Sequence, residues 1–406
     1  MGDRLLYKPE AKQILLHTAT APNVLYGGAA GGGKLQPVTS QVFTPFGPRP
    51  IGDLREGDLV SNPEGTTAFV SAVFPQGKRD IYEVEFVDGA VVECGIDHLW
   101  AAWRARNHGR RKRKIPYHVV RTAKLVEWLS QGHKVLMPVG EPVNFTKSYR
   151  PDWDVRPIEP YALGALLGDG HLPQAQLCTA DPEIAVALDA EFLSQKANNK
   201  ASTYHVPGVK DSLAQLGLTE CRAWDKFIPQ PYLYAPVEER WALLRGLMDT
   251  DGTVYRDRGR LGYCTTSPQL ARDVKFLVES LGGVAIIDEK QAHYSHNGER
   301  KAGRLAYNLR IKLPKPKQAF RLERKREICQ PPQNMYRRVK EIRPTGRRED
   351  CVCIVVDHPN GLYYTDHFVV THNSEALRWH GILSCLAVPG LQVLLVRREY
   401  TELNRT

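Results

Sequence analysis

The first residues that could do chemistry form a glycine-rich loop whose last member is missing. The stretch VLYGGAAGGGK places Gly28, Gly33 and Lys34 at the spacing of a phosphate-binding loop. In such a loop the backbone N–H groups approach the phosphates, the lysine reaches the terminal ones, and a following Ser or Thr hydroxyl holds magnesium. Here the following residue is Leu35, and Pro37 beyond it favours extended chain over the expected helix.

The missing half of the loop stands far along the chain. Residues 374–383 read SEALRWHGIL, and removing residues 35–373 joins Lys34 to Ser374 at the start of an amphipathic helix. A strand-like run, LQVLLVR, follows where a β-α-β unit requires it. The alternative is a glycine-rich turn and an unrelated helix, yet one deletion repairs the motif, the helix start and the element order together. We therefore predict that only the joined flanks bind ATP and Mg²⁺, through the loop glycines, Lys34 and Ser374.

The downstream end of the insert carries residues suited to cutting and joining a backbone. The side-chain amide of Asn373 can attack its own carbonyl and cut the chain after itself, while the neighbouring His372 moves a proton. The hydroxyl of Ser374 can hold an upstream segment as an ester before that cut. His-Asn-Ser alone mostly indicates a turn, and its position at the repair junction is what makes it specific.

Composition limits the classes of protein to consider. The 406 residues carry a formal charge of +10, which favours a polyanionic partner such as nucleic acid. No apolar run is long enough for a transmembrane helix and the first residues do not read as a secretory signal, so we expect no membrane contact and a cytoplasmic location. Eight cysteines without a CxxC pair argue against a disulfide scaffold or a zinc ribbon.

Apolar–polar alternation predicts the elements that must position the two ends of the insert. The runs IYEVEFV from residue 81, LYY from residue 362 and FVV from residue 368 read as short strands. Between about residues 155 and 325 the pattern changes, because helix-like apolar runs replace the short strands. The sequence therefore predicts a mainly β part that is interrupted by an α/β part.

Two resemblances to known families follow from these motifs. The flanks, residues 1–34 and 374–406, resemble the ATPase start of a phage terminase large subunit, a P-loop α/β ATPase. Residues 35–150 and 330–373 resemble inteins, which excise themselves from a host protein and use their own exteins as substrate. The blocks that carry the second resemblance are TSQVFTPFGPRPIGDLREGDLVSNPEG (39–65), VVECGIDHLWAAW (91–103) and EDCVCIVVDHPNGLYYTDHFVVTHN (349–373). The resemblance implies a Hint-type β horseshoe that brings both ends of the insert together.

The first residue of the insert departs from most inteins, which begin with Cys or Ser. Leu35 has no nucleophile, and the sequence resembles a minority type, the class 3 inteins, that carries a dispersed Trp-Cys-Thr set instead. Trp100, Cys353 and Thr371 stand at the matching positions. The resemblance implies that the Cys353 thiolate attacks the Lys34 carbonyl.

The remaining roles in the reaction are also implied by the resemblance. His98 protonates the departing amine, Ser374 takes over the acyl group, and Asn373 cyclises with the help of His372. No cofactor is expected for splicing.

Each of these residues has a rival or a simpler interpretation. Cys351, two residues from Cys353, would face the same side of a strand and is the rival nucleophile, and Cys94 is a poorer one. Trp100 could be core, a role for which Trp103 competes, Thr371 an ordinary strand residue, and His98 a satisfied core histidine. Two further residues qualify the intein resemblance: Gly95, where many inteins have Thr, and His367, which resembles a histidine that assists asparagine cyclisation.

The α/β part contains two copies of one motif. YALGALLGDGH from residue 161 and RWALLRGLMDTDGT from residue 240 each end a helix-like run in an acid beside glycine. Both copies resemble the motif of the LAGLIDADG homing endonucleases. The resemblance implies that the helices pack on small residues (Gly164, Ala165 and Gly246) and that Asp169 and Asp251 hold Mg²⁺ for cleavage of double-stranded DNA.

Further features of this part support that interpretation. WDKFIP at 224–229 resembles the family's lysine-containing block and makes Lys226 a catalytic candidate. The basic runs 104–114 and 315–326 could contact DNA phosphates. For the repeated motif, the alternative is two independent helix C-termini capped by glycine. For the chain as a whole, the alternatives are an endonuclease whose splicing ends are inactive and a nucleotide-binding fragment with a passive insert.

Overall fold

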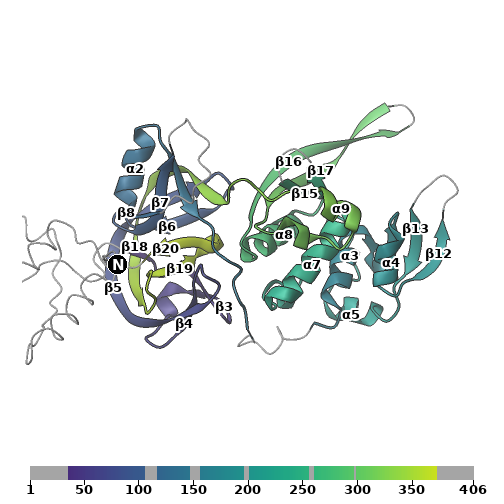
Figure 1. Cartoon of the computed structure of the whole chain (residues 1–406), viewed down its shortest axis with the longest axis horizontal. Coiled ribbons are helices and arrows are strands. Elements are labelled where there is room, and N and C mark those ends of the chain that lie inside the picture. Colours follow the sequence, from purple (N-terminus) through teal and green to yellow (C-terminus); the bar gives the residue numbers. More distant parts are fainter. Residues whose placement is uncertain are drawn as a thin grey trace, which may run out of the picture. The chain divides into compact units, whose positions relative to one another are not determined.

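The computed structural model describes residues 35–105, 117–146, 156–195, 201–255, 260–296 and 299–372. All of them belong to one compact unit, Gly33–Asn373. The predicted phosphate loop and the last two splicing residues, Asn373 and Ser374, lie outside the described residues. The described part comprises a β domain (described residues 35–146 and 329–372) and an α/β domain (described residues 156–328), and the second interrupts the first in sequence (Figure 1).

The β domain is built on one curled sheet, as the sequence predicts in general terms. The strand order is β3-β2-β19-β20-β7-β9-β18-β5-β4, with β1 on β18, β6 on β5 and β8 on β7. Its elements are β1 Gln36–Pro37, β2 Gln41–Thr44, β3 Gly47–Pro50, η1 Ile51–Asp53, β4 Leu59–Ser61, β5 Thr67–Phe86, β6 Val91–Cys94, β7 Leu99–Ala105, β8 His118–Arg121, α2 Thr122–Ser130, β9 Lys134–Pro138, β18 Tyr336–Val356, β19 Leu362–Thr365, η5 Asp366–Phe368 and β20 Val369–His372.

Two long antiparallel strands, β5 and β18, give this sheet its curl. Their ladder contains several register shifts, and such irregularities bend a strand and increase its twist. Strand β18 pairs with β9 near its start and with β1 near its end, so it serves several parts of the sheet. The strands consequently enclose separate apolar cores instead of forming one flat layer.

The α/β domain repeats one arrangement twice, which the repeated motif in the sequence indicates. Its two sheets have the orders β10-β11-β13-β12 and β14-β15-β17-β16, so the second copies the first. Its elements are α3 Pro160–Asp169, β10 Gly170–His171, η3 Leu172–Gln174, β11 Gln176–Thr179, α4 Pro182–Ala187, β12 Glu191–Gln195, β13 Ser202–His205, α5 Lys210–Gln215, α6 Gln230–Leu233, α7 Val237–Thr250, β14 Gly252–Tyr255, β15 Arg260–Thr265, α8 Pro268–Ser280, β16 Val284–His296, β17 Glu299–Lys312, η4 Pro316–Ala319 and α9 Glu323–Ile328.

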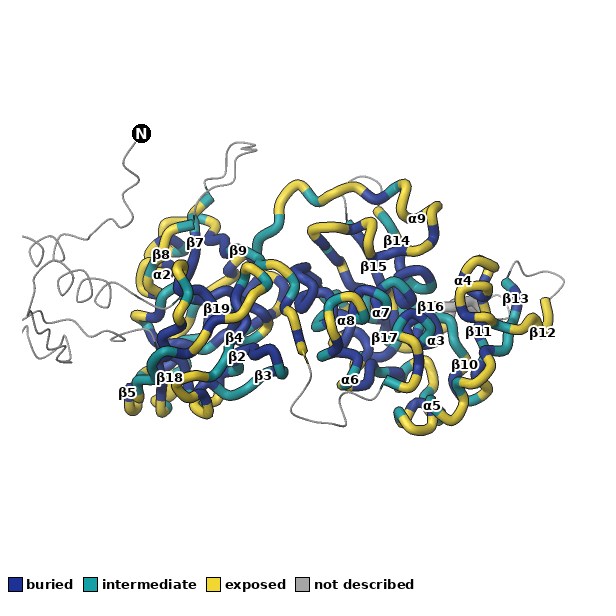
Figure 2. Tube along the Cα trace, turned by 60° about the horizontal axis from the view of Figure 1, so that its bottom comes forward, coloured by how far each residue is buried: buried dark blue, intermediate teal, exposed yellow. Residues whose placement is uncertain are grey.

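Helices α3 and α7 pack directly against each other at glycines. A Cβ added to Gly164 would lie 2.2 Å from the Leu243 carbonyl oxygen, and one added to Gly246 would lie 2.2 Å from the Tyr161 carbonyl oxygen. Only glycine allows backbones to approach this closely. Both helices are largely buried (Figure 2), and the residues around them form the main apolar core of the domain. The close packing fixes the carboxyl ends of the two helices side by side.

The β domain and the α/β domain meet at a buried cluster of charges. Arg337 of β18 lies 3.4 Å from Asp88 and 2.9 Å from Glu279 of α8, and Lys275 of α8 lies 3.2 Å from the same glutamate. Arg337, Asp88 and Glu279 are each almost fully buried. Because buried charges are stable only when paired, this cluster ties the two domains to one mutual arrangement.

Beside these charges lies a group of aromatic rings from both domains. Phe276 of α8 packs at 6.3 Å from Phe43 and at 5.1 Å from Phe368, measured between ring centroids. Phe43 and Phe368 stack on each other at 3.9 Å. The α/β domain thus covers an apolar surface of the β domain. Separately, none of the helices in the described ranges is both long and apolar enough to cross a bilayer.

Candidate active sites

The first residues of the insert form a short strand on β18. Strand β1 pairs antiparallel, with Gln36 opposite Val352 and Pro37 opposite Cys351. The pairing ends at Gln36, and the residue of β18 that follows its partner Val352 is Cys353. The extended chain predicted after Lys34 is therefore present, and its register leads to the predicted nucleophile.

The two rival thiols are poorly suited to act as nucleophiles. Burial, reinforced by Glu349, raises the pKa of Cys351 to about 11, and its Sγ contacts the Glu349 carbonyl oxygen at 3.3 Å. Burial raises the pKa of Cys94 to about 12, and its Sγ lies 3.5 Å from Thr122 Oγ1. Since the thiolate is the reactive species, the raised pKa values disfavour attack by either thiol. The predicted nucleophile, Cys353, is also buried, and its Sγ lies 3.5 Å from the Ile354 carbonyl oxygen.

The predicted His98, Trp100 and Thr371 come together in a fully buried cluster. Residues Thr371 of β20 and Trp100 of β7 are direct cross-strand partners. The Nε2 atom of His98 lies 2.5 Å from Thr371 Oγ1, and the rings of His98 and Trp100 meet edge to face at 4.8 Å. All three side chains are inaccessible to solvent.

The hydrogen bonds of Thr371 influence the tautomer of His98. The hydroxyl of Thr371 is also within 3.2 Å of the Leu99 carbonyl oxygen, to which it can donate. A hydroxyl has one proton, so when Thr371 donates to Leu99 the short contact requires a proton on His98 Nε2. Nδ1 is then the ring nitrogen that can deliver or accept a proton elsewhere.

Trp100 has a structural role as well. Its indole Nε1 donates to Thr122 Oγ1 at 2.9 Å, and its ring belongs to the apolar core under β7. The competing Trp103 is only half-buried and packs edge-on against Tyr336 at 6.4 Å. The structure thus places Trp100, and not Trp103, beside the predicted histidine.

The loop before His98 links it to the first residue of the insert. The Gly95 N–H donates to the Leu35 carbonyl oxygen at 3.0 Å, and the His98 N–H donates to the Gly95 carbonyl oxygen at 3.1 Å. At the other end, His372 lies on β20 opposite Leu99. Both ends of the described insert therefore meet the same loop and strand, residues 95–100.

His367 occupies an unusual backbone conformation. It lies in η5 with a φ of 56°, in the left-handed region that non-glycine residues adopt infrequently. Its side chain is exposed. Because Asn373 is not among the described residues, the structure assigns no distance between the two.

A second site lies in the α/β domain, where the carboxyl ends of α3 and α7 meet. Asp169 ends α3 and Asp251 directly follows α7. Burial, reinforced by the charge of Asp169, raises the pKa of Asp251 to about 6, and burial also raises the pKa of Asp169. The two carboxyl groups are thus close enough to repel each other, as the repeated motif predicts.

Two buried lysines flank these acids in matching positions. The Nζ of Lys226 donates to the carbonyl oxygens of Leu166, Gly168 and Gly170, at 2.8 to 3.2 Å. Burial lowers its pKa to about 8, although Asp251 and Asp169 act in the opposite direction.

Lys325 does the same for the other helix and was not predicted individually from the sequence. Its Nζ donates to the carbonyl oxygens of Met248, Asp249 and Gly252 at 2.7 to 2.8 Å. A cation at the carboxyl end of a helix satisfies carbonyl groups that the helix leaves unpaired. Each acidic helix end thus has its own lysine. The only available signal in the sequence was its place in the basic run 315–326.

The neighbouring acid, Asp249, is used for structure. Its carboxylate accepts hydrogen bonds from the Arg321 and Leu322 N–H groups and from the Tyr161 hydroxyl, at 3.0 to 3.3 Å. These contacts occupy both of its oxygens. Asp249 is thus bound within the fold, and Asp251 is the acid whose pKa is raised by the charge of Asp169.

The carboxylate pair is compatible with a magnesium ion. Within the described ranges no group of three or more His, Cys, Asp and Glu side chains could hold a metal. Mg²⁺ often uses only one or two carboxylates and completes its shell with water and substrate phosphates. The raised pKa of Asp251 fits such a site, because a bound cation would relieve the repulsion between the two acids.

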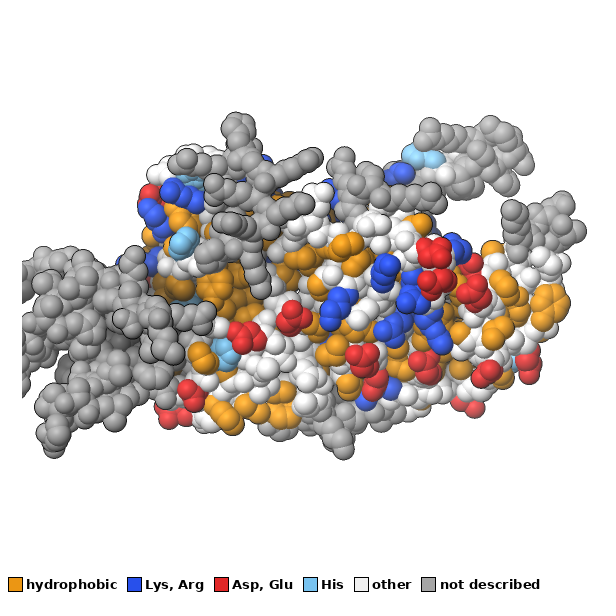
Figure 3. Space-filling view, viewed as in Figure 1, with side chains coloured by type: hydrophobic (Ala, Val, Ile, Leu, Met, Phe, Trp, Pro, Cys, Tyr) orange, Lys and Arg blue, Asp and Glu red, His pale blue; other side chains and the backbone are white. Residues whose placement is uncertain are grey.

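Of the two predicted basic runs, only 315–326 lies within the described residues, and several of its charges are paired inside the protein. Most of residues 104–114 lie outside the described ranges. In the run 315–326, Arg324 pairs with Asp181 at 2.5 Å, Arg326 pairs with Glu323 at 2.9 Å, and Lys325 is buried. On the face shown in Figure 3, positive and negative side chains of the α/β domain are interspersed. Much of this charge is therefore paired within the protein.

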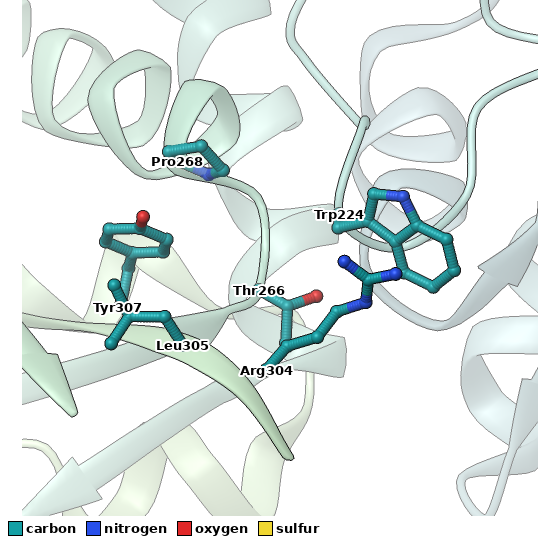
Figure 4. Close-up of a pocket in the computed structure, with 6 residues that line it drawn as sticks. All are labelled: Trp224, Thr266, Pro268, Arg304, Leu305 and Tyr307. Atoms are coloured by element: carbon teal, nitrogen blue, oxygen red, sulfur yellow. The ribbon is translucent and has the colours of Figure 1, made fainter. Parts of the chain in front are cut away.

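A pocket of about 400 Å³ lies beside the predicted lysine-containing block. The guanidinium of Arg304 lies over the ring of Trp224, 3.7 Å from its centroid (Figure 4). Thr266, Pro268, Leu305 and Tyr307 complete the lining. The pocket combines a cation with aromatic faces, a chemistry suited to planar or anionic groups.

Comparison with known proteins agrees with parts of this picture. Residues 238–312 match the family described as LAGLIDADG-like domain. The chain is 29% identical over 371 residues to the replicative DNA helicase DnaB of Mycobacterium intracellulare, covering 87% of this chain and 60% of that protein. It is 26% identical over 252 residues to the RecA protein of Mycobacterium bovis, covering 56% of this chain and 28% of that protein.

Solved structures with local similarity include an intein and a homing endonuclease. The MchDnaB-1 intein is 31% identical, with a TM-score of 0.16, over 16% of this chain and 52% of that chain. The homing endonuclease I-DmoI in complex with DNA and Ca is 14% identical, with a TM-score of 0.27, over 39% of this chain and 84% of that chain. Both TM-scores are far below those of chains that share a whole fold. The family match covers α7 and Asp251 but not α3, so residues 238–312 are similar to a LAGLIDADG-like domain.

Proposed function

We propose that the chain is a self-splicing precursor, in which residues 35–373 excise themselves and join Lys34 to Ser374. One observation carries this proposal: the two ends of the described insert meet at one loop. Gly95 hydrogen-bonds Leu35, and His98 bonds both Gly95 and Thr371. Excision requires such a meeting, because the cut ends must be joined before they diffuse apart.

The first step breaks the Lys34–Leu35 peptide bond. The Cys353 thiolate attacks the Lys34 carbonyl carbon, and a thioester to Cys353 forms as the carbon–nitrogen bond to Leu35 breaks. The departing nitrogen takes a proton from the His98 imidazolium and leaves as the free amine of Leu35. Thr371 supports this step by holding His98 Nε2, so that Nδ1 can deliver the proton.

The remaining steps transfer the segment and release the insert. The Ser374 hydroxyl attacks the thioester, forms an ester to Lys34 and returns the thiol of Cys353. The Asn373 side-chain nitrogen then attacks its own carbonyl, with His372 moving the proton, and releases Ser374 with a free amine. That amine attacks the ester, and the stable Lys34–Ser374 amide results.

The intact mass of the purified product tests this proposal. Splicing yields two species, the free insert (residues 35–373) and the joined flanks (residues 1–34 with 374–406). A single chain of 406 residues under all conditions would contradict it, and would favour either an endonuclease with inactive splicing ends or a nucleotide-binding fragment with a passive insert. The terminase origin of the flanks and their ATP binding after joining remain predictions of the sequence.

A second function is proposed for the α/β domain: cleavage of double-stranded DNA. It rests on the carboxylate pair Asp169 and Asp251 between two buried lysines. These carboxylates would hold Mg²⁺, which when bound activates water and stabilises the leaving oxygen of a phosphodiester. Lys226, with its pKa near 8, can donate a proton or stabilise negative charge beside the same acids.

A library of random double-stranded DNA with Mg²⁺ tests the endonuclease. Cleavage at a defined sequence that depends on Mg²⁺ supports the proposal, and the Asp169→Asn variant is the matched control. Equal cleavage by the variant would show that the activity has another source. The cytoplasmic location that the sequence leads us to expect remains part of this proposal.

A further inference from the structure

The side chain of Leu35 is enclosed by the β domain, although the proposed chemistry makes no use of it. Leu35 is 6% exposed and forms a small apolar cluster with Ile81 and Cys351. A hydrophobic residue at a cleavage junction could equally extend into solvent. Its burial shows that the structure provides a dedicated site for it.

Gly95 supplies the space for this side chain. A Cβ added to Gly95 would lie 2.4 Å from Leu35 Cδ1 and 2.8 Å from Leu35 Cγ. The backbone of Gly95 is not in the left-handed region, so conformation alone does not demand glycine there. Because Leu35 is almost fully buried and also packs with Ile81 and Cys351, it has little open space to move into. The side chain of Leu35 thus occupies the space that a side chain at Gly95 would need.

The backbone on both sides of this contact is also fixed. The Leu35 carbonyl oxygen accepts the hydrogen bond from the Gly95 N–H. The next residue, Gln36, is fully buried, and its side-chain amide donates to Thr365 Oγ1 at 2.8 Å and accepts from the Tyr363 hydroxyl at 3.2 Å. The residue after the scissile bond is therefore held by its side chain, its carbonyl group and its neighbour.

We infer that Leu35 is a positioning residue for the first cleavage, and that Leu35 and Gly95 form a size-matched pair. The inference rests on the proposed splicing reaction. The leucine provides no nucleophile and instead anchors the junction, so that the Lys34 carbonyl is presented to Cys353 on the neighbouring strand. Loss of the anchor would leave the peptide bond mobile, and a misplacement of about 1 Å can slow a reaction roughly 100-fold.

Two separate reactions of the full chain distinguish positioning from general instability. The first cleavage is measured in an Asn373→Ala background as the rate of release of residues 1–34 by dithiothreitol. Cleavage after Asn373 is measured in a Cys353→Ala background. Leu35→Ala should slow the first roughly 10- to 100-fold and leave the second unchanged, because only the first uses the Lys34–Leu35 bond.

Further variants test the size match. Gly95→Val alone should slow the first cleavage by a similar factor, and Leu35→Ala with Gly95→Val should recover much of the lost rate by refilling the space. Leu35→Met conserves volume and should keep most of the rate. Leu213→Ala removes the same atoms from the core of the α/β domain and should leave both reactions as they are.

The outcomes separate this inference from the proposed function. Absence of both cleavages in the unsubstituted chain overturns the splicing proposal itself. A splicing chain in which Leu35→Ala reacts at the parent rate, or loses both reactions equally, overturns the positioning role. A folded double variant that stays as slow as Leu35→Ala overturns the size match, and circular dichroism melting establishes which variants are folded.

Discussion

The two candidate sites of this chain are built on opposite physical principles. The cluster of His98, Trp100 and Thr371 is fully buried, uses hydrogen bonds and contains no carboxylate. The site of Asp169 and Asp251 is half-buried and consists of repelling acids between lysines. A reaction on the chain's own backbone needs no entry route, and its substrate is already in place. A reaction on DNA needs access and charges that can accommodate a metal and phosphates.

The comparison implies that the two activities can be removed independently, and Cys353→Ala is the strongest test. We expect no release of residues 1–34 and no joined product, because the proposed first acceptor of the Lys34 acyl group is gone. DNA cleavage should remain at the parent rate. Mass spectrometry reads the first result and gel electrophoresis of DNA the second.

The matched control for this variant is Cys351→Ala, which should still splice. Cys351 is buried in the same strand, and burial raises its pKa to about 11. If the two cysteine variants behave in the reverse way, the nucleophile has been assigned to the wrong thiol.

The converse variant is Asp169→Asn. It should lower Mg²⁺-dependent DNA cleavage by roughly 1,000-fold, in the range seen when one electrostatic contact to a transition state is lost. The rate of splicing should not change. Asp189→Asn, at a surface turn of the same domain, is a suitable control. Loss of splicing in Asp169→Asn would show that the two sites are coupled.

A smaller effect is expected at the buried hydrogen bond. Thr371→Val keeps the shape of the side chain and removes the hydroxyl that contacts His98. Release of residues 1–34 by dithiothreitol should slow roughly 10- to 100-fold, a part of what general acid catalysis supplies. Thr44→Val makes the same change at another buried hydroxyl, which donates to Gly47. If both variants slow equally, the effect is one of stability.

The rates of DNA cleavage and of splicing should depend differently on pH. In acid, DNA cleavage should slow relative to splicing by about tenfold for each pH unit. The raised pKa of Asp251, about 6, means that its carboxyl is neutral below that pH and charged above it. Only the charged form can hold a cation, so DNA cleavage should fall as the pH drops below 6. Higher Mg²⁺ should move the midpoint to lower pH, because the metal competes with the proton. A cleavage rate that is constant from pH 5 to 7 would contradict this role for Asp251.

Some residues of both sites could be predicted from the sequence because they belong to short local motifs. The repeated helix with its terminal acid and glycine identifies Asp169 and Asp251, and Pro37 indicates the extended start of the insert. The roles of Lys325 and of the pair Leu35 and Gly95 leave no such pattern. They arise from contacts between segments far apart in the chain, such as an ammonium meeting the carbonyls of a distant helix end.

The buried charges between the two domains bear on how this gene would change if cleavage of DNA ceased to be selected. Drift could then replace Asp169 or Asp251 without harm to the β domain. Replacing Glu279 would leave Arg337 buried with only Asp88 as an acidic partner, and breaking such a pair costs about 3–5 kcal/mol. Deleting the whole α/β domain would instead expose Phe43 and Phe368 to water and invite aggregation. Helix α8 should therefore outlast the enzymatic activity of the domain that contains it.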